Sequence, residues 1–282
     1  MYARCGFVDE SQDVFDEFDA KNVVSWNAMI SGYAQHGQGL LALDLFERMQ
    51  KQGIKPDRVI FIAILIACAN THALDQGKLI HYELIGSTVE LDASVGTALI
   101  DMYVKCGLLK EASEVFCQLI IGDVVSSTAM ISGYACQGKV KKVLSLVSRM
   151  KRKGIQEDTI TILSVLTSCS HAGLVDRGCE YFRDVRKENK AFLADEHYNC
   201  LIDIMARAGQ LDKAIEVIES MPLQPKPMMW MALLGACRKW GNVELARYAF
   251  ISVVELSSDD KQATPFVLMS NIYGDSYMCE DA

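Results

Sequence analysis

The chain has 282 residues, half of them apolar, and a formal net charge of −8 at pH 7. This composition excludes a disordered chain, and the acidic balance argues against a protein that coats nucleic acid without specificity. No apolar run reaches the roughly 18 residues that a membrane-spanning helix needs, and a count of only five prolines suits a helical protein.

Two stretches of the sequence are nearly copies of each other. The seven residues Ala28–Ala34 return unchanged as Ala129–Ala135, at an offset of 101 residues. The same offset aligns MYARCG at the start of the chain with MYVKCG from Met102. An identity of this length at a fixed offset indicates internal repeats. Because Met102 lies within a predicted helix, we expect the chain to begin inside a repeat, with no targeting segment ahead of it.

The repeats follow one another along the whole chain. Residues 1–22 form a partial short repeat, and residues 227–282 form C-terminal helical segments of which the second pair is incomplete. Repeats of 35, 35 and 31 residues account for the 101-residue offset. The complete repeats between these ends span residues 23–57, 58–92, 93–123, 124–158, 159–194 and 195–226.

Each repeat is predicted to hold two helices. In repeat 23–57 the first helix is expected from about Ser25 to Gln35, and Gly53 and Pro56 end the second helix. The second helix carries an apolar stripe at Leu40, Ala42, Leu43, Leu45, Phe46 and Met49. One repeat cannot bury its stripe alone, but stacked neighbours can. The predicted fold is therefore all-α, a right-handed α-solenoid superhelix of stacked helix–turn–helix repeats.

The cysteines and histidines do not predict a chemical site. Cys68, Cys169 and Cys237 fall at one repeat position, no C-x-x-C pair occurs, and we expect buried or half-buried packing thiols in a reducing compartment. His81-Tyr82-Glu83 matches the first half of the zinc deaminase signature, but the P-C-x-x-C half is absent. We therefore expect no catalytic residue, no metal, no cofactor and no enzymatic activity.

Several motifs resemble a known family. VVSWNAMISGYAQHGQGLLALDLFERM, MYVKCG and SCSHAGLVDRG resemble the ordinary, short and long repeats of plant organellar pentatricopeptide repeat proteins. ALLGACR followed by GNVE, and then SNIY, resemble the C-terminal extension motifs of the same subclass. The resemblance covers essentially the whole chain. The related tetratricopeptide repeats have a steadier period near 34 residues and a Trp-Leu-Gly-Tyr pattern that is absent here.

The resemblance implies that the chain reads single-stranded RNA, one base per repeat. In this family the fifth and last residues of a repeat select the base, and apolar second residues of neighbouring repeats sandwich it. Asn27 with Asp57 resembles a uracil or pyrimidine reader, and the two threonine–aspartate pairs resemble guanine readers. The predicted RNA-binding residues are Val24, Asn27, Asp57, Thr97, Asp123, Val125, Thr128, Asp158 and Asn199.

Other repeats depart from this scheme. Ile62 with Asp92 and Leu163 with Ala194 place an apolar fifth residue where no hydrogen bond to a base edge can form, so these long repeats are interpreted as spacers. Asn199 is accompanied by Lys226 rather than aspartate, which leaves its base preference undefined. Since the family binds RNA parallel to the chain, the predicted target resembles U-x-G-G-x-pyrimidine.

Two alternatives stay open at this point. The aspartates at the repeat ends could simply cap helices. The basic residues could attract phosphates or form a solvated outer face; they include Arg48, Lys51, Lys105, Lys141, Lys142, Arg149, Lys151, Arg152 and Lys153.

The resemblance implies a specificity factor for organellar RNA processing, such as C-to-U editing. It would act in the mitochondrion or plastid, with single-stranded organellar RNA as its partner. A deaminase domain or an editing-accessory protein would act in trans, without a membrane. The alternative function is a helical-repeat scaffold that binds proteins and no RNA.

Overall fold

The computed structural model describes Phe15 and residues 22–119, 123–188, 193–222, 224–256 and 263–278. Within these ranges the chain consists of α-helices joined by short turns, with no β-strand. The partial repeat expected over residues 1–22 lies outside the described residues, apart from Phe15 and Asn22.

The described helices, α2 to α16, alternate between first and second helices of successive repeats. Seven first helices begin at the first residue of a predicted repeat or of the C-terminal segment, so the expected start near Ser25 was two residues late. The first helices are α2 (Val23–Gln35), α4 (Arg58–Thr71), α6 (Ala93–Lys105), α8 (Val124–Cys136), α10 (Thr159–His171), α12 (Asp195–Arg207), α14 (Pro227–Trp240) and α16 (Thr264–Met278). The second helices are α3 (Gly39–Lys51), α5 (Leu74–Gly86), α7 (Leu109–Gln118), α9 (Val140–Arg152), α11 (Val175–Glu188), α13 (Leu211–Glu219) and α15 (Val243–Leu256).

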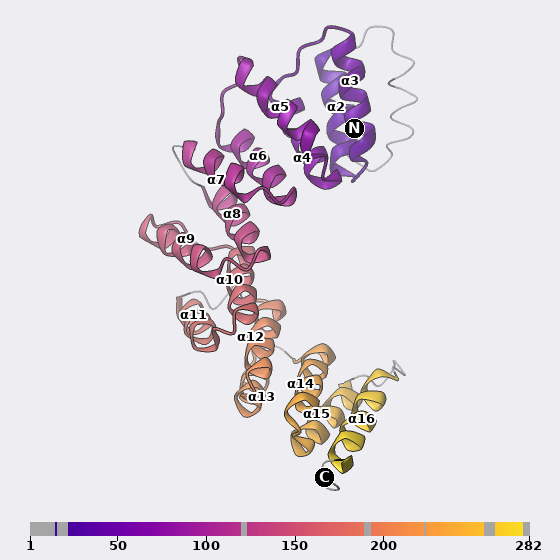
Figure 1. Ribbon diagram of the computed structural model, residues 1–282, viewed down its shortest axis with the longest axis vertical. Coiled ribbons are helices and arrows are strands. Elements are labelled where there is room, and N and C mark those ends of the chain that lie inside the picture. The colour runs from indigo at the N-terminus through magenta and orange to yellow at the C-terminus, as the bar shows by residue number, and fades with distance from the viewer. Residues whose placement is uncertain are drawn as a thin grey trace. The chain divides into compact units, whose positions relative to one another are not determined.

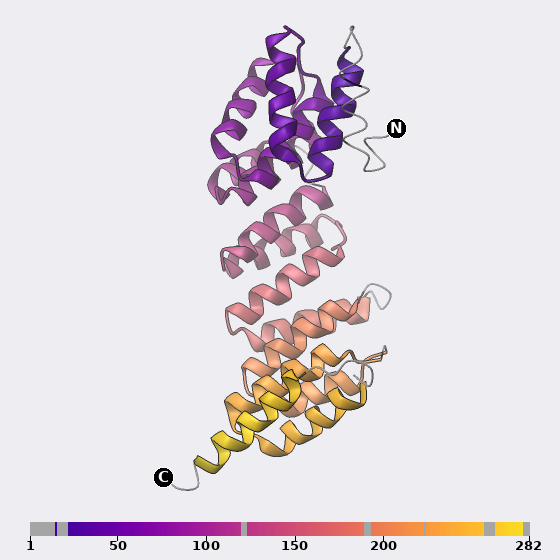
Figure 2. The same cartoon turned by 90° about the vertical axis from the view of Figure 1, so that its right-hand side faces the viewer.

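The chain forms two compact blocks. The first block holds residues 1–134 and 149–156, and the second holds residues 135–148 and 157–282. Within the first block, α4 packs against its own second helix α5 and against the first helices α2 and α6. In the second block, α12 packs in the same way against α13, α10 and α14. Figures 1 and 2 show the helical pairs following one another in each block, which confirms the all-α solenoid class.

The core of each block is the buried stripe of its helices. In α3, Leu45, Phe46 and Met49 are fully buried, together with Ala42. Leu40 was expected in this stripe but is exposed. It precedes Ala42 by two residues, which places it on the opposite side of a helix with 3.6 residues per turn.

Residues next to the helices explain where the helices begin and end. Side-chain carboxylates accept the otherwise unpaired backbone N–H groups of the first turn: Asp57 accepts from Ile60 at 3.0 Å and Asp158 from Thr161 at 2.7 Å. Gly53 follows α3 with φ of +73°, a left-handed conformation that glycine adopts without strain. The turn residues therefore fix where each hairpin reverses.

The cysteines divide into two groups. Cys68, Cys169 and Cys237 are buried, and burial raises the pKa of their thiols, to about 12 for Cys68 and about 11 for Cys237. The prediction of packing thiols is correct at this repeat position. It is wrong for Cys117 and Cys136, which are exposed because they lie off the buried stripe of their helices.

None of the described helices combines the length and the apolar character that crossing a membrane would take.

Candidate nucleic-acid interface

Asn27 and Asp57 lie side by side although 30 residues separate them in the chain. The Asn27 side chain donates from Nδ2 to Asp57 Oδ2 at 2.7 Å. The second carboxylate oxygen, Oδ1, accepts the backbone N–H of Ile60 and so caps α4. Asp57 thus has both roles that the sequence left open, since one oxygen caps a helix and the other holds the fifth residue of the repeat.

The contact with Asp57 fixes the orientation of the Asn27 amide. A carboxylate only accepts hydrogen bonds, so the NH₂ group must face it and the carbonyl must point away. Asn27 Oδ1 is buried and has no hydrogen-bond partner among the described residues. Its carbonyl and its remaining N–H are one acceptor and one donor, as the edge of a pyrimidine requires, but a base reaches the carbonyl only after the side chains that cover it shift.

The second residues of several repeats are exposed although they are apolar. Val24 is 72% exposed and Val125 is 60% exposed, as a residue that stacks on a base requires. The structure adds residues that the sequence analysis did not name, since Val59, Ile160 and Met228 occupy the equivalent second positions and are 50%, 57% and 72% exposed. The repeat boundaries alone would have located them.

Thr97 and Asp123 are not joined in this structure. Asp123 Oδ1 accepts from the backbone N–H of Ser126 at 2.8 Å and from its hydroxyl at 2.6 Å. The Thr97 hydroxyl is buried and has no partner within the described residues. The hydroxyl of threonine lies one bond closer to the backbone than the amide nitrogen of asparagine, so it reaches less far.

Thr128 and Asp158 belong to different blocks. Thr128 is buried on α8 in the first block, and Asp158 caps α10 in the second. Their action as a pair therefore stays a prediction from the sequence.

Lys226 pairs with the first residue of its repeat instead of the fifth. Its Nζ lies 2.6 Å from Asp195 Oδ2, and this hydrogen bond raises the pKa of Lys226. Asn199 is half-buried on α12, one turn beyond Asp195. An ammonium has no acceptor, so Lys226 cannot orient an amide NH₂ group as Asp57 does.

In repeat 58–92 the first and last residues also form an ion pair. Asp92 Oδ1 accepts from Ser94 and Val95, and Oδ2 forms an ion pair with Arg58 at 2.7 Å. The fifth residue Ile62 faces a small notch of about 140 Å³ between α2 and α4. The notch is lined by Ser31, Ala34, Gln35, Val59, Ile62, Ala63 and Ile66.

His197 and His81 have structural partners. His197 is fully buried; Nδ1 accepts the backbone N–H of Ala194 at 3.0 Å, and Nε2 lies 3.1 Å from the carbonyl oxygen of Thr159. His81 Nδ1 lies 2.8 Å from the Tyr103 hydroxyl, and burial lowers the pKa of His81. No group of three or more His, Cys, Asp or Glu residues in the described ranges could hold a metal ion.

Comparison with known proteins identifies the repeats. The model of the PPR repeat family matches residues 21–70 and 122–171, and the PPR repeat model matches residues 97–121 and 196–223. The chain belongs to the pentatricopeptide repeat family. It is 41% identical over 281 residues to a putative mitochondrial pentatricopeptide repeat-containing protein of Arabidopsis thaliana, covering 98% of this chain and 44% of that protein.

Further pentatricopeptide repeat proteins match along the whole chain. The chloroplastic protein CRR2 of Arabidopsis thaliana is 38% identical over 283 residues, covering 100% of this chain and 43% of its own length. The chain thus spans less than half the length of these two curated relatives. A crystal structure of PPR10 in complex with an 18-nt psaJ RNA element superposes with a TM-score of 0.81 at 19% identity, covering 98% of this chain and 42% of PPR10. This likeness shows the shared fold.

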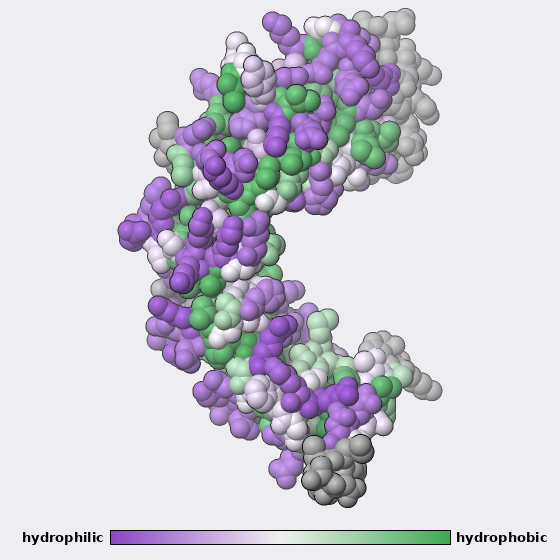
Figure 3. Space-filling model, viewed as in Figure 1, coloured by the Kyte–Doolittle hydropathy of each residue, from purple (hydrophilic) through white to green (hydrophobic). Residues whose placement is uncertain are grey.

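The basic residues of this pentatricopeptide repeat chain lie mostly on second helices. Arg48 and Lys51 are on α3, and Lys51 pairs with Glu47 one turn earlier at 3.6 Å. The surface over α9 is largely hydrophilic (Figure 3) and carries Lys141, Lys142, Arg149, Lys151 and Arg152. Lys105 is the exception, since it lies on the first helix α6 and pairs with Asp101 at 2.9 Å. The placement of the others favours a solvated outer face.

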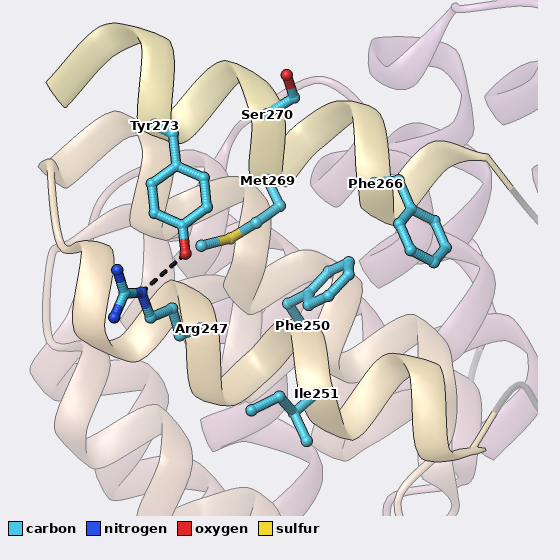
Figure 4. A pocket seen from close by; sticks show the side chains of 7 residues that line it. All are labelled: Arg247, Phe250, Ile251, Phe266, Met269, Ser270 and Tyr273. Carbon is cyan, nitrogen blue, oxygen red and sulfur yellow. Dashed lines mark hydrogen bonds between the residues drawn. The ribbon is translucent and has the colours of Figure 1, made fainter. Parts of the chain in front are cut away.

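A larger cavity of about 640 Å³ lies between α15 and α16 (Figure 4). Phe250 and Phe266 meet edge to face with ring centroids 5.1 Å apart, and Arg247 Nε donates to the Tyr273 hydroxyl at 2.8 Å. Ile251, Met269 and Ser270 complete the lining. The cavity contains none of the fifth or last residues of repeats 23–57 to 195–226, so it is separate from the predicted reading positions.

Proposed function

We propose that this chain binds single-stranded RNA in a sequence-specific manner, through the fifth and last residues of its repeats. The observation that carries the proposal is the 2.7 Å hydrogen bond from Asn27 to Asp57, which fixes the amide with its nitrogen toward the carboxylate and its carbonyl away from it. Exposed Val24 and Val59 on the two adjacent first helices would flank a base at this position. The proposed target is U-x-G-G-x, written 5′ to 3′, followed by a sixth base at Asn199 whose identity the repeat does not define.

We further propose that the RNA is organellar and that binding specifies a processing site, with C-to-U editing as the process. Support comes from relatives named as mitochondrial and chloroplastic, and from the sequence resemblance of residues 227–282 to extension motifs. Editing chemistry would in addition require a deaminase. The alternation of ordinary, long and short repeats is part of the same proposal.

The test measures binding of a short RNA that contains the target, and of variants with one base changed, by gel shift or fluorescence anisotropy. In Asn27→Asp the amide donor is lost and two carboxylates face each other, so uracil discrimination at the first position should fall about tenfold. Thr128→Asn should shift the fourth position from guanine toward uracil. Affinity should decrease as the salt concentration rises, because phosphate contacts release counterions.

The competing function, a scaffold for proteins, predicts the opposite pattern. If neither substitution changes base preference and affinity is insensitive to salt, RNA reading is wrong.

A further inference from the structure

The last residue of a repeat has different partners in different repeats, and where the first residue of the repeat is charged, that residue is the partner. In repeat 23–57 the first residue is Val23, which carries no charge. The last residue, Asp57, is then bonded to the fifth residue, Asn27, at 2.7 Å.

Two other repeats have a charged first residue, and in both it pairs with the last residue. In repeat 58–92, Arg58 lies 2.7 Å from Asp92. In repeat 195–226 the charges are exchanged, and Asp195 lies 2.6 Å from Lys226. The two pairs form in different blocks and with opposite polarity, so the contact follows from position in the repeat rather than from one local sequence.

Competition for the carboxylate of the last residue would account for the two repeats that end in aspartate. One carboxylate oxygen is occupied by capping the next first helix, as in Asp57 and Asp92. The second oxygen is the one that binds Asn27 in one repeat and Arg58 in the other. A guanidinium and a carboxylate attract each other as two full charges, whereas a neutral amide offers only its dipole. A charged first residue would therefore draw the carboxylate away from the fifth residue.

We propose that the first residue of each repeat is a positioning residue for base reading. When the first residue is uncharged, the carboxylate of the last residue is available to orient the fifth residue. A charged first residue binds that carboxylate instead. This proposal rests on the proposed function. In repeat 93–123 the first residue Ala93 is uncharged, and Asp123 has no ion pair within the described residues; the fifth residue Thr97 is simply too short to meet it.

The first test removes reading from a repeat that has it. Val23→Arg should draw Asp57 away from Asn27 and reduce discrimination for uracil over the other bases at the first RNA position by about three- to tenfold. The measured quantity is the ratio of affinities for RNAs that differ at that base, because an added positive charge strengthens phosphate attraction for every sequence. Gln52→Arg adds the same charge at the exposed C-terminal end of α3 and serves as the matched control, with the ratio unchanged.

The second test creates reading in a repeat that lacks it. Ile62→Asn alone should give no uracil preference at the second RNA position, because Arg58 still holds Asp92. Ile62→Asn combined with Arg58→Val should release Asp92 and give about a three- to tenfold preference for uracil there. A crystal structure of the double variant should show the amide nitrogen of the introduced asparagine bonded to Asp92.

The outcomes separate this inference from the proposed function. If Asn27→Asp abolishes discrimination but Val23→Arg leaves it intact, the positioning role is overturned and RNA reading stands. The positioning role is also overturned if Ile62→Asn alone reads uracil as well as the double variant does. If the parent chain discriminates no base at all, both proposals are overturned together.

Discussion

Repeats 23–57 and 195–226 both have asparagine as the fifth residue, yet only one of them holds that asparagine in a fixed orientation. Asp57 holds Asn27, whereas Lys226 pairs with Asp195 and leaves Asn199 without an equivalent partner. The difference shows that an asparagine at the fifth position is not by itself held in a fixed orientation. The residues at the two ends of the repeat decide whether the fifth residue is oriented.

The helix starts that follow Asp57 and Ala194 also differ. Asp57 precedes repeat 58–92 and caps α4. Ala194 precedes repeat 195–226 and has no side-chain group that can cap α12; the His197 ring instead accepts the backbone N–H of Ala194 and lies 3.1 Å from the carbonyl oxygen of Thr159. Asp57 thus caps a helix and holds the fifth residue of its repeat, whereas the buried His197 ring ties the start of α12 to α10.

The largest expected effect tests this structural role. His197→Ala should lower the free energy of unfolding by about 2–4 kcal/mol, because it opens a cavity at a fully buried ring and removes the contacts of that ring with the N–H of Ala194 and the carbonyl of Thr159. Equilibrium urea unfolding measures the change. His171→Ala, at an exposed histidine on α10, is the control and should stay within about 0.5 kcal/mol of the parent. An equal effect of the two substitutions would refute the role of His197.

A smaller effect tests the double role of Asp57. Asp57→Ala should lower the free energy of unfolding by about 1 kcal/mol through loss of the α4 cap and should also reduce uracil discrimination about tenfold. Asp92→Ala removes the equivalent cap of α6 in a repeat with an apolar fifth residue. It should cost similar stability without changing base preference at any position. If both variants lose discrimination, the effect comes from general destabilisation rather than from reading.

The smallest expected effect concerns a variant that gives repeat 195–226 end residues like those of repeat 23–57. Lys226→Asp combined with Asp195→Val reproduces the arrangement of Asp57 and Val23 around Asn199. We expect uracil preference at the sixth RNA position to rise about threefold, measured as the ratio of affinities for RNAs that differ at that base. Lys226→Asp alone should raise the uracil preference less, because Asp195 then repels the new carboxylate. Equal behaviour of the single and double variants would show that the first residue has no influence here.

Much of the fold could be read from the sequence because it depends on local periodicity. The 101-residue offset located the repeats, and the apolar spacing of α3 placed Leu45, Phe46 and Met49 in the core. The aspartates at the repeat ends were foreseen as possible caps, since a carboxylate before a helix accepts first-turn N–H groups regardless of the surrounding fold. Leu40 was misplaced because a set of apolar residues wider than one helix face cannot all point inward.

The candidate site was only partly predictable for a different reason. Asn27, Asp57 and the exposed Val24 follow from their places in the repeat, and repeat position also predicts Val59, Ile160 and Met228. Which group the last residue binds does not follow from repeat position alone. That choice depends on how closely two first helices approach and on which charges they bring to the same oxygen atom.

The sequence by itself therefore determined the repeat period, the helical pairs and the residues that occupy each repeat position, because these are set by short-range spacing and turn chemistry. Only the tertiary structure decided that Asp57 holds Asn27, that Arg58 holds Asp92 and that His197 joins the start of α12 to α10. These contacts join groups on neighbouring first helices or across a helix start. The packing of adjacent repeats brings those groups within hydrogen-bonding distance.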